Sequence, residues 1–144
     1  MRIAAVIAAV LGLIAAPAWA DDKPPQPGTT VEMPILITPL VVEGRLGGYV
    51  YVSSMIVATS PNAAIEVRAK APFIQDAFVR DVNGASVVKP GVSDANGLDA
   101  NAVDSDGLTA RLLADARRIA GDKKIAGVKL TQVTFAPLRD TSGS

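Results

Sequence analysis

The residues best able to bind an ion are acidic side chains between positions 94 and 106. Asp94, Asp99, Asp104 and Asp106 stand there among asparagines and glycines. Calcium needs about six to eight oxygen ligands, which an EF-hand loop supplies from fixed acidic positions and a final glutamate. The spacing fits from neither Asp94 nor Asp99, and the segment contains no glutamate. We therefore interpret it as a solvated loop leading into a helix cap, and we expect no metal site.

A second set of carboxylates, Glu66, Asp76 and Asp81, falls within a predicted helix. Paired carboxylates perform acid–base catalysis in glycoside hydrolysis, where they flank a sugar-binding cleft. Here they alternate with Arg68 and Arg80, a pattern typical of a salt-bridged helix surface. We predict no catalytic residue, and Arg68 and Arg80 remain the candidates for binding a partner.

Composition narrows the possible chemistry further. The chain of 144 residues contains no histidine and no cysteine. This excludes His-based triads, cysteine nucleophiles, thiolate zinc sites and disulfides. The 14 basic and 14 acidic residues give zero formal net charge, whereas nucleic-acid-binding proteins usually carry a basic excess. We expect a protein that is not an enzyme, that needs no cofactor and that does not bind nucleic acid.

The elements that position these side chains begin with a predicted hairpin. Residues 35–43 and 49–58 are rich in β-branched residues and predict two strands. The glycine-rich stretch 44–48 predicts a loop of about five residues between them. Because proline cannot donate to a sheet ladder, Pro39 predicts that the first strand is an edge strand or contains a bulge.

A long helix is predicted from Ser60-Pro61 to Asn83-Gly84, because serine and proline suit a helix start and glycine suits its end. Pro72 predicts a kink near Ala71 or a division into two helical segments. Helical spacing predicts a core-facing stripe at Ile65, Ala69, Phe73, Ala77 and Phe78, with Ile74 and Val82 beside it.

After an irregular stretch, a second helix is predicted with Asp104, Ser105 or Asp106 as its cap and Gly121 at its end. A last strand at 125–135 changes phase near Thr131-Gln132, which predicts a bulge or a twist there. The order of elements predicts an α+β fold. In it, two helices cover one face of a mainly antiparallel sheet made of the N-terminal hairpin and the C-terminal strand.

The first twenty residues have the pattern of an export signal. One arginine precedes an apolar run, and Ala18-Trp19-Ala20 predicts cleavage between Ala20 and Asp21. The alternative is an uncleaved anchor, since a membrane-spanning helix needs about 20 apolar residues. Both interpretations place the rest of the chain outside the cytoplasm. We predict a signal peptide or anchor at 1–20, a proline-rich linker at 21–31, one domain at 32–138 and a polar tail at 139–144.

Three segments resemble a known family. Met33-Pro34 through Val41-Val42, the strand YVYVSSMIVA and the helix AAIEVRAKAPFIQDAFVRDVN at 63–83 resemble the periplasmic domain of FliL-like, flagellar basal-body-associated proteins. LTARLLADARRIAG and IAGVKLTQV stand where that family has a second helix and a closing strand. The similarity covers about Met33 to Pro137 and consists of a register of apolar and charged residues, so it assigns no role to an individual residue.

The resemblance implies a stomatin-type fold and a non-enzymatic role. FliL-like proteins are inner-membrane proteins whose periplasmic domains oligomerise around the flagellar stator. The resemblance therefore implies protein partners in the stator or basal body, a homo-oligomer and a periplasmic location, with membrane attachment only if the N-terminal segment is retained. A soluble periplasmic adaptor or binding protein unrelated to motility remains the alternative.

Overall fold

The computed structural model describes residues 26–94 and 98–138. Its elements follow the chain as β1 (Thr30–Val42), β2 (Arg45–Ala58), α1 (Pro61–Gly84), the short 3₁₀ helix η3 (Ala100–Ala102), α2 (Ser105–Ala120) and β3 (Ile125–Pro137). The three strands form one antiparallel sheet in the order β1-β2-β3. The predicted α+β class is confirmed.

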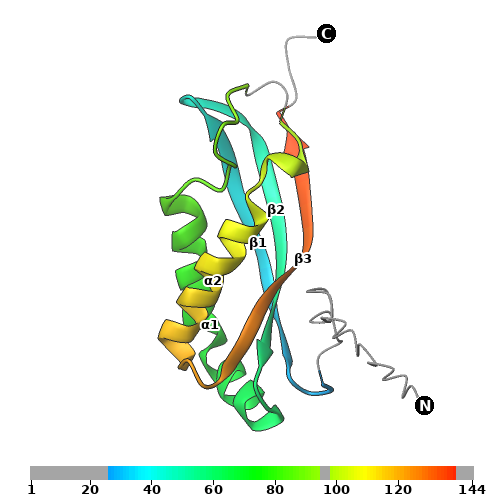
Figure 1. The fold of residues 1–144 in the computed structure, drawn as a ribbon, viewed down its shortest axis with the longest axis vertical. Helices are drawn as coiled ribbons and strands as arrows, with labels where there is room; N and C mark the ends of the chain where they lie inside the picture. The colour runs from blue at the N-terminus through cyan, green and yellow to red at the C-terminus, as the bar shows by residue number, and fades with distance from the viewer. Residues whose placement is uncertain (1–25, 95–97, 139–144) are drawn as a thin grey trace, which may run out of the picture.

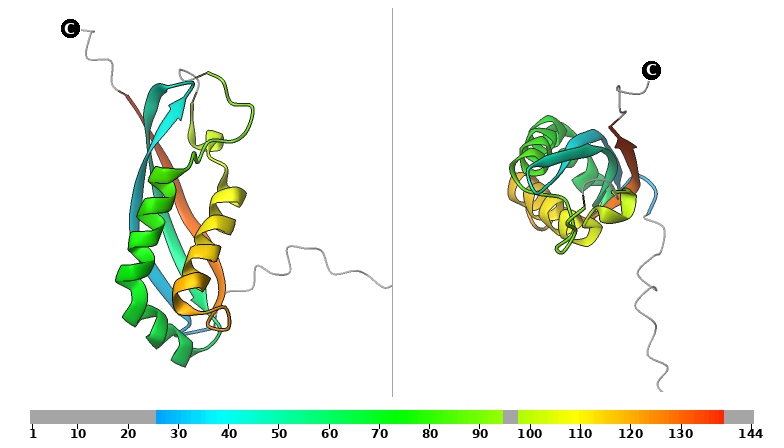
Figure 2. Two further views of the ribbon diagram at one scale, coloured as in Figure 1. Left: turned by 90° about the vertical axis from the view of Figure 1, so that its left-hand side faces the viewer. Right: turned by 90° about the horizontal axis from the view of Figure 1, so that it is seen from above.

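The molecule has two layers, with both helices on the same face of the sheet (Figures 1 and 2). We call this the inner face. Alternate residues of each strand point into it, as the period of two in a β-strand requires. They meet the apolar stripes of α1 and α2, and the largest fully buried side chains are Phe78, Leu36, Leu40, Ile56, Ile74, Leu108, Leu112 and Ile125.

The hairpin is tighter than predicted. Val42 pairs with Arg45, so the turn has only two central residues, Glu43 and Gly44. Both have positive φ, 52° and 76°, which is the conformation of the two-residue turn that matches the twist of paired strands. The predicted five-residue loop is wrong, because Leu46 and Gly48 belong to the ladder, paired with Val41 and Leu40.

Two predictions about strand irregularities are confirmed. β1 lies at the edge of the sheet, where Pro39 removes no ladder hydrogen bond toward a second neighbour. In β3, Gln132 pairs with Ser53 while Leu130 pairs with Ser54, so Thr131 is the extra residue of a bulge. β1 begins earlier than predicted, at Thr30, and the end of the expected linker is therefore part of the sheet.

α1 continues through Pro72 as one helix, so the predicted division into two segments is wrong. The predicted apolar stripe is confirmed at Phe78, Ile74 and Val82, which are buried. It is wrong at Ile65 and Phe73, which are 62% and 67% exposed. A helix turns about 100° per residue, so steps of four alone rotate steadily away from one face, whereas mixed steps of three and four stay on it. The buried stripe follows the mixed steps at Ala64, Val67, Ile74, Phe78 and Val82, with Ala71 half-buried.

The connection between the helices is organised by short contacts. Val88 pairs with Val103 in an isolated β-bridge, and Val87 is buried. Asp104 is the cap of α2, since its Oδ1 accepts from the backbone N–H of Gly107 at 3.1 Å. Gly121 ends α2 with φ 104°. The predicted positions of the second helix are thus confirmed at both ends.

Candidate functional site

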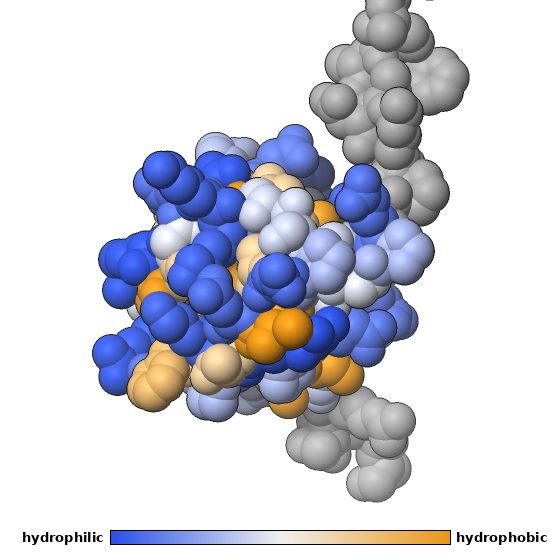
Figure 3. Space-filling view, turned by 90° about the horizontal axis from the view of Figure 1, so that it is seen from below, coloured by the Kyte–Doolittle hydropathy of each residue, from blue (hydrophilic) through white to orange (hydrophobic). Residues whose placement is uncertain are grey.

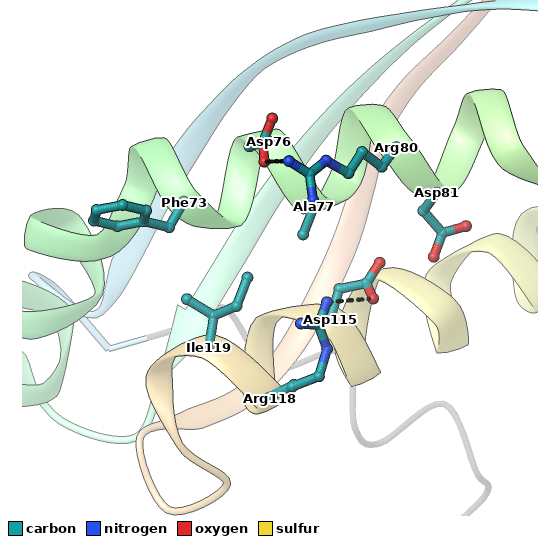
Figure 4. A pocket seen from close by; sticks show the side chains of 8 residues that line it. All are labelled: Phe73, Asp76, Ala77, Arg80, Asp81, Asp115, Arg118 and Ile119. Atoms are coloured by element: carbon teal, nitrogen blue, oxygen red, sulfur yellow. Dashed lines mark hydrogen bonds and ion pairs between the residues drawn. The ribbon is translucent and has the colours of Figure 1, made fainter.

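A hollow of about 370 Å³ lies between the outward parts of α1 and α2 (Figure 4). It combines apolar side chains with charged ones of both signs. Its lining residues are Phe73, Asp76, Ala77, Arg80, Asp81, Asp115, Arg118 and Ile119. We call it the helix groove.

Arg111 of α2 joins the two helices through Asp81, which lines the helix groove. Its Nε donates to Asp81 Oδ1 at 2.7 Å, and its Nη2 also pairs with that carboxylate. Its Nη1 donates to the carbonyl oxygen of Ser86 at 2.9 Å. Both side chains of the ion pair are largely buried, so the guanidinium holds the end of α1 against α2 through charge-assisted hydrogen bonds.

Among the described residues, Asp115 of α2 is the acidic residue whose pKa is clearly shifted. Its pKa is raised from 3.8 to about 6, most of all by burial and also by the hydrogen bond and the negative charge of Asp81. Arg118, 3.4 Å from Asp115 Oδ1, acts in the opposite direction. The other oxygen, Oδ2, is buried without a hydrogen-bond partner among the described residues. The carboxyl group thus holds a proton more readily than an ordinary aspartic acid.

In the described part of the chain, the three carboxylates that line the helix groove each lie beside an arginine. Asp81, the second carboxylate, is already neutralised by Arg111. No group of three or more potential metal-ligating side chains occurs among residues 26–94 and 98–138. The arrangement raises the pKa of the Asp115 carboxyl at the contact of the two helices, so its charge depends on pH near 6.

The structure separates the residues singled out in the sequence. Arg80 pairs with Asp76 at 2.9 Å on the exposed surface of α1. Arg68 donates instead to the carbonyl oxygen of Thr30 at 3.2 Å, near the start of β1. Glu66 pairs with Lys124 at 2.8 Å. The predicted carboxylates therefore serve three different cations, and Arg68 and Arg80 do not form one binding site.

The acidic segment is used for local capping where the structure describes it. Asp99 Oδ1 accepts from the backbone N–H of Asn101 at 2.8 Å, at the start of η3. Asp104 caps α2 in the same way. These contacts agree with the interpretation of this segment as a loop leading into a helix cap.

A second candidate site is the face of the sheet opposite α1 and α2, which no helix of the described residues covers (Figures 1 and 2). On β1, Ile35, Ile37 and Val41 are 58%, 54% and 46% exposed, and on β2, Tyr49 and Tyr51 are each 40% exposed. Ile37 pairs with Tyr51, and Pro39 pairs with Tyr49, so these side chains are neighbours across the strands. They form one apolar surface.

The third strand completes this surface with uncharged residues. Tyr51 pairs with Thr134, and Tyr49 pairs with Ala136. Two shallow hollows of about 340 and 380 Å³ share Ile35, Ser53 and Gln132 in their lining. We define the outer sheet face by ten residues from the three strands: Ile35, Ile37, Pro39, Val41, Tyr49, Tyr51, Ser53, Gln132, Thr134 and Ala136.

Sequence reasoning did not identify the outer sheet face, although a signal for it was present. An antiparallel sheet with one wet face normally alternates apolar and polar residues, while runs of apolar residues are typical of strands covered on both faces. β1 contains the run ILITPLVV, in which only Thr38 is polar. Thr38 points inward, where its hydroxyl donates to the carbonyl oxygen of Val82 at 2.8 Å. The outward positions of this run are therefore all apolar.

The surface seen from below is less apolar than the outer sheet face. It is mainly hydrophilic, with small apolar patches separated by polar ones (Figure 3). Scattered apolar side chains are normal on a protein surface and need no partner. The outer sheet face differs from this surface because its apolar side chains adjoin one another across neighbouring strands.

The predicted cleavage residues Ala18, Ala20 and Asp21 lie outside the described residues, as does the predicted tail at 139–144. Within the described residues, no helix combines the length and the apolar character needed to cross a bilayer. Comparison of the sequence with protein-family models and with curated proteins found no match. The similarity to FliL-like proteins therefore depends on the residue pattern alone.

Proposed function

We propose that this chain is a non-catalytic, FliL-like periplasmic domain that binds other proteins and supports the flagellar motor or stator. The observation that carries the interaction role is the outer sheet face. Its five large apolar side chains from β1 and β2 are contiguous and 40% or more exposed. Contiguous apolar surface of this kind marks interaction sites in soluble proteins.

The order of elements supports the FliL-like part of the proposal. A hairpin is followed by a long helix, a second helix and a closing strand, which is the order that the resemblance implies. The helix groove supports the non-catalytic part, since Asp81 is held by Arg111 and Asp76 by Arg80. These carboxylates stabilise the helix pair and its surface.

A periplasmic location requires export by residues 1–20, with either cleavage after Ala20 or retention as an inner-membrane anchor. The intact mass of the protein purified from its natural host separates these two forms. Trp19 is the only tryptophan of the chain, so a cleaved protein emits tyrosine fluorescence alone. A protein found in the cytoplasm at its full mass would contradict the proposed location.

The functional test is deletion of the gene in the natural host, followed by measurement of swimming. We expect reduced swimming that the wild-type gene restores. A gene carrying Ile37→Lys and Tyr51→Lys should not restore it, because two charges then lie in the outer sheet face. A gene carrying Ile65→Lys should restore it, since Ile65 is at least as exposed as these two residues but lies on α1.

Normal swimming and normal flagella in the deletion strain would contradict the flagellar role. The outer sheet face would then belong to a periplasmic adaptor unrelated to motility. Failure of the Ile65→Lys gene to restore swimming would contradict the assignment of the interaction to the sheet.

A further inference from the structure

We infer that the end of the molecule at which β1 begins binds the surface of an anionic phospholipid bilayer. This end is separate from the outer sheet face, and lipid binding there does not require the flagellar role. Three observations support it: the distribution of charge along the molecule, the contacts that fix cations at this end, and the position of the apolar N-terminal run in the chain.

The zero net charge of the chain conceals an uneven distribution along its long axis. At the lower end in Figure 1, where α1 begins and α2 ends, the described residues include five cations and two carboxylates. We call this set the basic end, and its members are Arg68, Lys70, Arg117, Lys123, Lys124, Glu66 and Asp122. The basic end thus has an excess of three positive charges.

The opposite end has the reverse excess. The hairpin, the connection between the helices and the first turn of α2 lie at the upper end in Figure 1. The charged residues described there are Glu43, Asp94, Asp99, Asp104, Asp106, Arg45 and Lys89. Five of them are acidic and two are basic, while the remaining described residues carry equal numbers of acids and bases. The fold is therefore a charge dipole.

Backbone carbonyl oxygens fix three cations of the basic end. Arg68 Nη2 donates to the carbonyl oxygen of Thr30 at 3.2 Å. Lys70 Nζ donates to the carbonyl oxygen of Ile119 at 3.4 Å. Arg117 donates from Nε and Nη2 to a carbonyl oxygen at the start of β3. Because a carbonyl oxygen carries no formal charge, these contacts position the cations without neutralising them.

The turn between α2 and β3 adds two lysines to this end. The side chain of Lys123 is exposed, and its carbonyl oxygen accepts from the hydroxyl of Thr59 at 2.8 Å. Lys124 pairs with Glu66 at 2.8 Å. The cations thus come from α1, α2 and this turn, at the mainly hydrophilic end that Figure 3 shows from below. Cations spread over one end of a fold suit an array of lipid headgroups.

The chain leads from the basic end toward its apolar run. Thr29 lies at this end, where its carbonyl oxygen accepts from the N–H of Ala58 at 2.7 Å. Nine residues, 21–29, separate Ala20 from β1, and they extend at most about 30 Å at about 3.3–3.6 Å per residue. A chain that retains residues 1–20 in a bilayer would therefore keep the basic end near the headgroups.

The linker carries one net negative charge, which is too little to cancel the basic end. A cation near an anionic membrane raises the binding constant about fivefold. This attraction acts over a Debye length of about 8 Å at physiological ionic strength, so salt should weaken it. The acidic upper end is repelled by the same surface. The molecule would then stand with its hairpin away from the bilayer, which leaves the outer sheet face accessible to a protein partner.

The first experiment measures lysine acetylation by mass spectrometry in the full chain, purified in its natural processed form. The protein is mixed with vesicles of phosphatidylglycerol and phosphatidylcholine, or of phosphatidylcholine alone. A form that retains residues 1–20 is reconstituted into the same vesicles. We expect phosphatidylglycerol to slow the acetylation of Lys70 and Lys123, because headgroups then cover them. Lys89, at the opposite end, should react at the same rate on both kinds of vesicle.

The second experiment compares two double variants that have the same net charge. Lys70→Gln with Lys123→Gln removes two exposed cations from the basic end. It should weaken co-sedimentation of the cleaved chain with phosphatidylglycerol vesicles about 25-fold. Arg45→Gln with Lys89→Gln removes two exposed cations from the acidic end and should leave binding unchanged. In a chain that retains residues 1–20, loss of the protection of Lys124 from acetylation replaces co-sedimentation as the measurement. Circular dichroism confirms that each variant is folded.

Four results would overturn lipid binding by the basic end. One is equal acetylation of Lys70 and Lys123 on both kinds of vesicle. Another is an equal loss of binding in the two double variants, since net charge alone would then be responsible. Displacement by inorganic phosphate at constant ionic strength would indicate a site for free phosphate. Loss of vesicle binding in Ile37→Asn alone would move the contact to the outer sheet face. Normal swimming in the deletion strain contradicts only the flagellar role, and protection of Lys70 and Lys123 in such a strain's protein would still support lipid binding.

Discussion

On its inner face the sheet presents Val50, Val52 and Ile56 to two helices, whereas on its outer face Ile35 and Ile37 meet solvent. The residue types on the two faces of β1 and β2 are similar, and the difference lies in what covers them. An antiparallel sheet needs only one covered face to fold, so its second face is free to be polar. Apolar residues kept on that second face thus point to binding after folding.

The largest expected effect comes from a pair of phenylalanines on α1, one on each side of the helix. Phe78→Ala should lower the free energy of unfolding by about 3–5 kcal/mol, because the ring is fully buried against the sheet. Phe73→Ala should change it by less than about 0.5 kcal/mol, since that side chain is 67% exposed. Urea denaturation of both variants checks the comparison, and equal losses would contradict the assignment of the inner face.

These two residues also show how far the sequence could predict the fold. Both follow helical spacing from Ile65, and the spacing alone does not decide which stripe faces the sheet. The decision comes from the sum of contacts along five turns, in which Val67, Ile74 and Val82 align with Phe78. The caps of α2 were predictable, since Asp104 and Gly121 form hydrogen bonds with residues only three or four positions away in the sequence.

The candidate sites were less predictable because they depend on pairing between distant segments. Asp81 and Asp115 are brought close only when α1 packs on α2, and nothing local to either residue indicates it. The outer sheet face depends on the register that places Ile37 beside Tyr51. The apolar run of β1 was visible in the sequence, but which of its residues point outward follows from the tight turn at Glu43-Gly44.

The second prediction concerns the inner face near the hairpin, where Phe135 of β3 lies over Gly48. Gly48 has φ 155°, and an added Cβ would lie 2.7 Å from Phe135 Cε2 and closer still to the carbonyl oxygen of Ala136. Gly48→Ala should therefore lower the free energy of unfolding by about 1–3 kcal/mol, because both the Phe135 ring and the backbone at Ala136 must move.

Gly127→Ala is the matched control in β3, since an added Cβ there meets nothing within 4 Å and the backbone has no positive φ. Its effect should be neutral or slightly stabilising, through the reduced freedom of the unfolded chain. Thermal melts of the two variants at one pH provide the comparison. A Gly48→Ala variant as stable as the wild type would show that the inner face near the hairpin is not closely packed.

The smallest expected effect concerns the helix pair that covers the inner face, and it depends on pH. The folded-state pKa of Asp115, about 6, lies above its ordinary value of 3.8. The folded protein thus binds a proton more tightly than the unfolded chain, so this group destabilises the fold above about pH 6 and ceases to do so as the pH falls toward 4.

Asp115→Asn removes that charge while keeping the size of the side chain, and its amide can donate to Asp81. The variant should be more stable than the wild type at pH 8, and the difference should shrink between pH 6 and pH 4. Asp76→Asn is the control, because Asp76 is exposed and its ion pair with Arg80 is solvated, so its effect on stability should be small. Urea denaturation at both ends of the pH range measures the two differences. An equal gain in stability for Asp115→Asn at pH 4 and pH 8 would contradict the raised pKa of the Asp115 carboxyl. The packing of α1 and α2 on the inner face would then be insensitive to pH in this range.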